Sequence, residues 1–77
     1  MSDPIVARVA KCDPSTGLAW IGERQAWLSR EDRKWTLCDD YTGETILITR
    51  TSIAAVVRAW GVHIGVAVES IDTEIEY

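Results

Sequence analysis

TILITRTSIAAVVRAWG, residues 45–61, is the stretch that decides the fold of this 77-residue chain. Its first six residues are mostly β-branched, a composition typical of a strand. Thr51 or Ser52 then offers a hydroxyl that accepts a hydrogen bond from an unpaired N–H in the first turn of a helix. Gly61 suits the position just past a helix end. The stretch therefore predicts a strand followed by a helix over about 51–60.

One face of this predicted helix is apolar. Ile53, Val56, Val57 and Trp60 recur at i, i+3, i+4 and i+7, the spacing of a stripe that packs against other elements. Because Trp60 ends the stripe, we expect its indole in the core, where Trp20 joins it.

Beyond Gly61 the apolar residues alternate, which predicts a strand from Val62 onward. This prediction places His63 inside a strand, either buried or facing a partner. The alternation slips by one residue at Glu69-Ser70, and a one-residue slip sends the following side chains to the opposite face. We therefore expect either a β-bulge there or a separate short final strand.

The N-terminal half is typical of strands joined by turns. Residues 13–17 and 39–44 are rich in Asp, Gly, Thr and Pro, which favour turns, and the second is expected to be a solvated hairpin turn. Residues 23–29 fit either a strand or a short helix, and we favour strand–turn–strand across a charged loop at 30–34. The strands predicted before the helix are residues 5–12, 18–21, 23–29, 35–38 and 45–50.

These elements predict one compact α+β domain over residues 1–77. The sheet is small and mostly antiparallel, with about five to six strands, and the helix at about 51–60 packs on one face. An open sheet and a small, partly closed barrel both fit this outline. A domain of this size buries only about 60% of its unfolded-chain surface, so association into a homo-oligomer would add stability.

The formal net charge of −4 is concentrated at the C-terminus. The acids of the last nine residues account for all of it, because the remaining charges cancel. Phosphate contacts require clustered cations, and the most basic stretch, residues 23–35, has four cations that three acids largely offset, so we do not expect nucleic-acid binding. An acidic final strand protects a sheet edge against pairing. Alternatively, its alternating carboxylates would imitate a row of phosphates and occupy a nucleic-acid-binding protein. Small inhibitors encoded by mobile elements can work in this way.

Catalytic and metal-binding patterns are not recognisable. Cys12, Cys38 and His63 lack the paired ligand spacing of a zinc site, and the glycines form no phosphate-binding motif. A Cys–His nucleophile pair would need His63 beside a thiol, which its apolar strand context disfavours. Neither a signal peptide nor a long apolar segment is evident, so the sequence predicts free thiols and a cytoplasmic location. We expect no enzymatic activity and no cofactor.

The four tryptophans carry most of the functional information. Trp is enriched in protein interfaces, and two of the four flank the charged loop, where the sequence gives the least reason for burial. The sequence therefore predicts a small protein-binding module of bacterial or phage origin, with a homo-oligomer as one form of it. Two alternatives are a structural subunit of a larger assembly, such as a virion, and a mobile-element-encoded inhibitor that uses the acidic C-terminal strand. The candidate contact residues are Trp27, Arg30, Arg33, Trp35, Asp72, Glu74 and Glu76.

Overall fold

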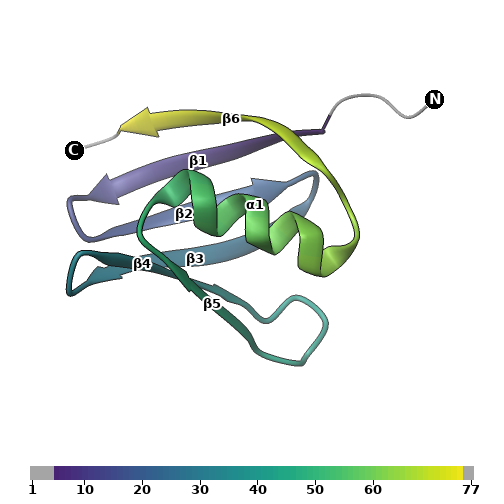
Figure 1. The fold of residues 1–77 in the computed structure, drawn as a ribbon, viewed down its shortest axis with the longest axis horizontal. Helices are drawn as coiled ribbons and strands as arrows, with labels where there is room; N and C mark the ends of the chain where they lie inside the picture. The colour runs from purple at the N-terminus through teal and green to yellow at the C-terminus, as the bar shows by residue number, and fades with distance from the viewer. Residues whose placement is uncertain (1–4, 76–77) are drawn as a thin grey trace.

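A computed structural model describes residues 5–75 of the chain (Figure 1). Six strands and one helix follow the order expected for an α+β domain. In chain order the elements are β1 (Ile5–Asp13), β2 (Thr16–Ile21), β3 (Arg24–Glu31), β4 (Lys34–Asp39), β5 (Ile46–Arg50), α1 (Ile53–Ile64) and β6 (Val68–Ile75).

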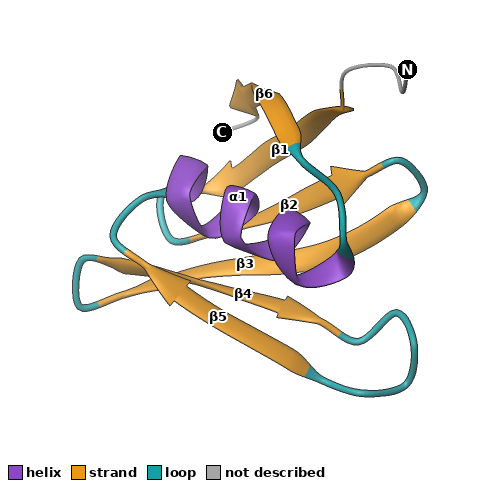
Figure 2. Cartoon of the chain, turned by 45° about the vertical axis from the view of Figure 1, so that its right-hand side comes forward, coloured by secondary structure: helices purple, strands orange, loops and turns teal. Residues whose placement is uncertain are grey.

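The six strands form one sheet in the order β5-β4-β3-β2-β1-β6. β1 to β5 form an antiparallel meander, after which α1 crosses the sheet and returns the chain as β6, parallel to β1. All of α1 lies on one face of the sheet, as both ribbon views show (Figures 1 and 2). The mostly antiparallel α+β prediction is confirmed, whereas the alternative of a small, partly closed barrel is wrong, because β5 and β6 are the two free edges of an open sheet.

The stretch that fitted either a strand or a helix forms a strand, as favoured from the sequence, although Glu23 lies in the turn before β3 and the strand begins at Arg24. The charged loop expected at 30–34 is shorter than predicted, because Arg30 and Glu31 continue β3 and Lys34 already begins β4. Only Asp32 and Arg33 remain in the turn, with φ of 51° and 63°. Two consecutive residues with a left-handed backbone conformation match the twist of a tight two-residue hairpin turn. The other three charged residues, Arg30, Glu31 and Lys34, therefore lengthen the two strands.

The predicted helix end is wrong. Gly61 lies inside α1, which ends at Ile64 and is capped by Gly65, where φ is 87° and the backbone N–H donates to the Gly61 and Val62 carbonyls. Gly61 is small for another reason, since a Cβ there would lie 2.7 Å from a methyl group of Val68. The expected strand from Val62 is therefore the last turn of the helix, and His63 is an exposed helical residue.

The start of the helix and the slip before β6 are both explained locally. The Ser52 hydroxyl accepts from the Ala55 N–H at 3.1 Å, so Ser52 is the N-cap. In the β1–β6 ladder, Val68 and Ser70 pair with consecutive residues of β1, which leaves Glu69 as an extra residue. The expected bulge is thus confirmed.

The core lies between α1 and the covered face of the sheet. Trp60 is fully buried there, as predicted, and Trp35 is only 7% exposed. Trp20 corrects the sequence prediction, because it is half-buried on the other face of the sheet. The buried cluster consists of Ala7, Val9, Ala19, Ile21, Ala26, Leu28, Trp35, Leu37, Val56, Val57 and Trp60.

Candidate interaction surface

The sheet face opposite α1, here called the open face, carries a row of apolar side chains that crosses five strands. Adjacent strands pair Ala10 with Leu18, Leu18 with Trp27, Trp27 with Cys38, and Cys38 with Leu47. These five residues are the apolar row. Trp27 is 58% exposed and Leu47 is 67% exposed. No other element of residues 5–75 covers them, because the one helix of that range lies on the opposite face (Figure 2).

Trp20 lies on the same face, beside the apolar row. Its indole N–H donates to Gln25 Oε1 at 3.2 Å, and the Arg8 guanidinium lies 5.5 Å from the centre of its ring. The cation and the hydrogen bond fix the orientation of this second indole. A shallow hollow of about 70 Å³ opens beside it, lined by Arg8, Val9, Ala10, Trp20, Asp72 and Glu74.

Two carboxylates border the apolar row on β6. Asp72 pairs with Arg8 and Glu74 pairs with Ala10 in the parallel ladder, so both side chains belong to the open face. Both are exposed, and neither has an ion-pair partner among residues 5–75. The β6 margin of the open face is therefore negatively charged.

The structure brings some of the predicted contact residues together and separates others. Trp27, Asp72 and Glu74 share the open face. Trp35 lies on the covered face, with the Lys11 ammonium 5.6 Å from its ring centre, so almost none of its surface is left for a partner.

The two predicted arginines lie away from the open face. Arg30 pairs with Trp35, at the end of the covered face, and Arg33 belongs to the hairpin turn. Glu76 lies outside the described residues. Sequence reasoning missed Leu18, Trp20 and Leu47, although the alternation within each strand was a usable signal.

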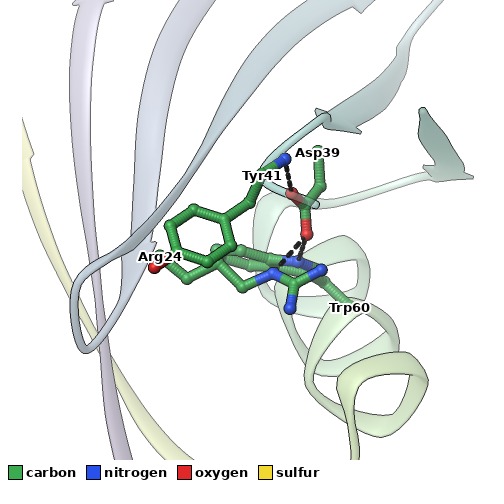
Figure 3. Close-up of polar contacts among 4 residues, drawn as sticks. All are labelled: Arg24, Asp39, Tyr41 and Trp60. Carbon is green, nitrogen blue, oxygen red and sulfur yellow. Dashed lines mark hydrogen bonds and ion pairs between the residues drawn. The ribbon is translucent and has the colours of Figure 1, made fainter. Parts of the chain in front are cut away.

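The most elaborate polar cluster surrounds Asp39, which is fully buried (Figure 3). Its Oδ2 accepts from Arg24 Nε and from Trp60 Nε1, both at 2.7 Å, and its Oδ1 accepts from the Tyr41 N–H at 2.9 Å. The Tyr41 ring also lies 5.3 Å from the Arg24 guanidinium carbon. Asp39 therefore fastens the helix, through Trp60, to two neighbouring strands.

The Asp39 carboxylate is held in its charged form. Burial raises its pKa, but the hydrogen bonds from Tyr41, Trp60 and Arg24, together with the Arg24 charge, outweigh burial and lower the pKa below its ordinary value. Both oxygens already accept hydrogen bonds inside the core. The cluster is thus suited to stabilising the fold, and the solvated turn expected at 39–44 begins only after Asp39.

The remaining chemistry of the described chain is sparse. Within residues 5–75, His, Cys, Asp and Glu side chains form no group of three that could hold a metal ion. Cys12 and Cys38 are free thiols, the first exposed and the second half-buried. The same part of the chain contains no helix with the length and apolar character needed to cross a membrane.

Comparison with family models, with curated proteins and with solved structures finds no match to this chain. The open face combines an exposed indole, a continuous apolar row and a margin of exposed carboxylates.

Proposed function

We propose that this chain is a small protein-binding module without enzymatic activity, and that it binds its partner through the open face. The observation that carries the proposal is the 58% exposed indole of Trp27 in the middle of the apolar row. Tryptophan is enriched among the residues that contribute most to the free energy of protein association. An isolated exposed apolar residue is ordinary, but a row that spans five strands supports a contact surface.

The charges beside the row support a partner with basic side chains. Asp72 and Glu74 form no ion pair within residues 5–75, and Arg8, opposite Asp72 on the same face, is the one cation beside these two carboxylates in the ladder. A partner that places Lys or Arg against β6 and apolar side chains against Trp27 would complement both features. The same carboxylates would repel the phosphates of a nucleic acid, so a protein is the better-supported partner.

The dimensions of the domain set an upper limit on the area of the open face. The two longer dimensions are 38 and 26 Å, so the face measures at most roughly 1,000 Å² in projection. A standard protein interface, which buries about 800 Å² on each partner, would therefore occupy most of this face.

One alternative function has an observation of its own. An inhibitor of a nucleic-acid-binding protein would present carboxylates to that protein's basic groove, and the exposed pair Asp72 and Glu74 supports this version of the proposal. Both versions share the open face and differ only in the identity of the basic partner. A cytoplasmic location is proposed as well, supported by the two free thiols Cys12 and Cys38.

Site-specific photo-crosslinking tests the surface even while the partner is unidentified. A photoreactive residue replaces Ser29, exposed on the open face two positions from Trp27, in one variant and Arg58, exposed on α1, in the control. Expressed in the source cell, the first variant should capture a defined protein and the second should not. Equal capture by both variants would contradict the assignment of the open face.

The captured protein then allows affinities to be measured by calorimetry. Removing a central Trp anchor costs about 2 kcal/mol or more, so Trp27→Ala should weaken binding about 30-fold. Glu74→Lys should weaken it too, and the loss should shrink as salt is raised. Wild-type affinity for Trp27→Ala, with its fold intact by circular dichroism, would refute the proposed function.

A further inference from the structure

The two edges of the sheet are protected very differently. β6 carries acidic side chains along its length, and charges of this kind prevent edge strands from pairing with one another. β5 has no charged side chain from Ile46 to Thr49. It is apolar on both faces, because Ile48 packs partly against the core and Leu47 is 67% exposed on the open face. An edge of this kind is a template for another strand.

Side-chain contacts show which backbone groups of β5 point away from the sheet. The hydroxyls of Thr36 and Thr49 meet at 3.0 Å, the close approach typical of a cross-strand pair that does not exchange backbone hydrogen bonds. The Thr49 carbonyl instead accepts from the Arg50 guanidinium at 2.7 Å. Since N–H and C=O of one strand residue point the same way, and residues two apart share that direction, the outward groups belong to Leu47 and Thr49.

We propose that β5 pairs antiparallel with β5 of a second copy of this chain, across a twofold axis beside Ile48. In this register Leu47 of each copy lies opposite Thr49 of the other, and each such pair exchanges two N–H···O bonds. No other register pairs both outward residues of β5 with outward residues of its copy. The Thr49 oxygen has a second lone pair, so its contact with Arg50 leaves room for the new donor.

A second copy fits this edge better than an unrelated strand for three reasons. The uncharged segment is self-complementary, so the same patch serves both partners in a closed dimer. The acidic β6 edges lie at the far ends of the joined sheet, where they block further growth. The pairing also brings the two Leu47 side chains near each other on the open face, so the two apolar rows become continuous. The dimer would therefore present two Trp27 anchors on one surface.

Amide hydrogen exchange of the full chain, followed by NMR over protein concentrations of about 5 µM to 1 mM, tests this pairing directly. The amides of Leu47 and Thr49 should exchange rapidly when dilute and become at least 10-fold slower as the dimer forms. The amides of Ile46 and Ile48 face β4 and should be protected throughout. Sedimentation should show a mass that rises to that of a dimer over the same concentration range.

One threonine on each edge strand provides a matched comparison. Thr49→Pro removes an outward N–H of β5 and should abolish the concentration-dependent mass, whereas Thr73→Lys on the β6 edge should leave it unchanged. If Thr49→Pro does not fold, Thr49→Lys replaces it and should weaken the dimer in the same way. A strict monomer at 1 mM, growth beyond a dimer, or a dimer whose Leu47 and Thr49 amides stay unprotected would each overturn the proposal. A failed dimer leaves the photo-crosslinking test of the open face intact, so the two proposals fail separately.

Discussion

Asp39→Asn is the substitution that tests most directly what holds the helix to the sheet. The wild-type carboxylate receives donors from three side-chain or backbone groups, two of them at Oδ2. An asparagine must place its NH₂ group at one of the two oxygen positions. At the Oδ1 position it would face the Tyr41 N–H, and at the Oδ2 position it would face the donors of Arg24 and Trp60. In either orientation a buried donor faces another donor.

The expected loss of stability is about 3 kcal/mol. A hydrogen bond to a charged group contributes about 1 kcal/mol more stability than a hydrogen bond between neutral groups. The variant replaces the charged acceptor by a neutral amide, so it weakens the hydrogen bonds from Arg24 and Trp60. An unsatisfied buried donor adds about 1–3 kcal/mol. Because the Arg24 side chain is 21% exposed, water compensates part of its lost ion pair, which keeps the total near the lower end of the range for buried pairs. For a domain of this size the melting temperature should fall by about 15 °C.

Urea denaturation monitored by fluorescence and circular dichroism measures this loss, with Asp40→Asn as the control. Asp40 is the next residue, exposed, and its variant should stay within about 0.5 kcal/mol of wild type. A loss below 1 kcal/mol for Asp39→Asn would refute the account of the cluster. Near-equal losses for both variants would refute it too.

The difference in stability between wild type and Asp39→Asn should depend on pH in a defined way. Since the folded-state pKa of Asp39 is lowered, its ionised form stabilises the fold above about pH 4, and this contribution disappears as the pH falls through the folded-state pKa. The difference between wild type and Asp39→Asn should therefore be constant from pH 5 to 8 and shrink below about pH 4. The pKa of Asp13 is also lowered, by the Thr16 hydroxyl and then by the Ser15 N–H, but that contribution cancels in the difference. A difference that grows on acidification would contradict the sign.

Three further sites test the packing. Ser52→Ala should cost about 1 kcal/mol in urea unfolding, whereas Thr51→Ala should leave the midpoint unchanged, because only Ser52 caps α1. Gly61→Ala should destabilise by about 1 kcal/mol despite its better helix propensity, since its Cβ would meet a Val68 methyl at 2.7 Å; a gain in stability would contradict that contact. Trp35→Ala should cost about 3–5 kcal/mol, and a loss below 1 kcal/mol would contradict its burial.

The features that depend on residues close together in the sequence were predictable from the sequence. The strand at 45–50, the apolar stripe of the helix and the bulge at Glu69 all follow from local composition or periodicity. The end of the helix was not predictable, because a glycine is favoured both just past a helix terminus and wherever another segment approaches the backbone closely. Gly61 serves the second purpose, and only the position of Val68 distinguishes the two.

The polar cluster and the assignment of the tryptophans depend on contacts between distant segments. Asp39 belongs to a stretch with every sign of a solvated turn, yet its partners Arg24 and Trp60 are 15 and 21 positions away. Trp20 alternates with Ala19 and Ile21, and residue size alone favours the indole as the buried member. In the folded sheet it is Ala19 that faces the helix.

The arrangement of small and large residues explains why Trp27 lies on the open face. Ala7, Ala19 and Ala26 occupy the covered face of three adjacent strands and are fully buried, which lets α1 approach the sheet closely enough for Trp60 to fill the core. The next residue after Ala26 is Trp27, on the other face, where nothing in residues 5–75 covers it. Replacing this indole with a polar side chain would remove no core contact. The cross-strand contacts of Trp27 with Leu18 and Cys38 account for its buried part, and the proposed partner would account for the 58% of the side chain that is exposed.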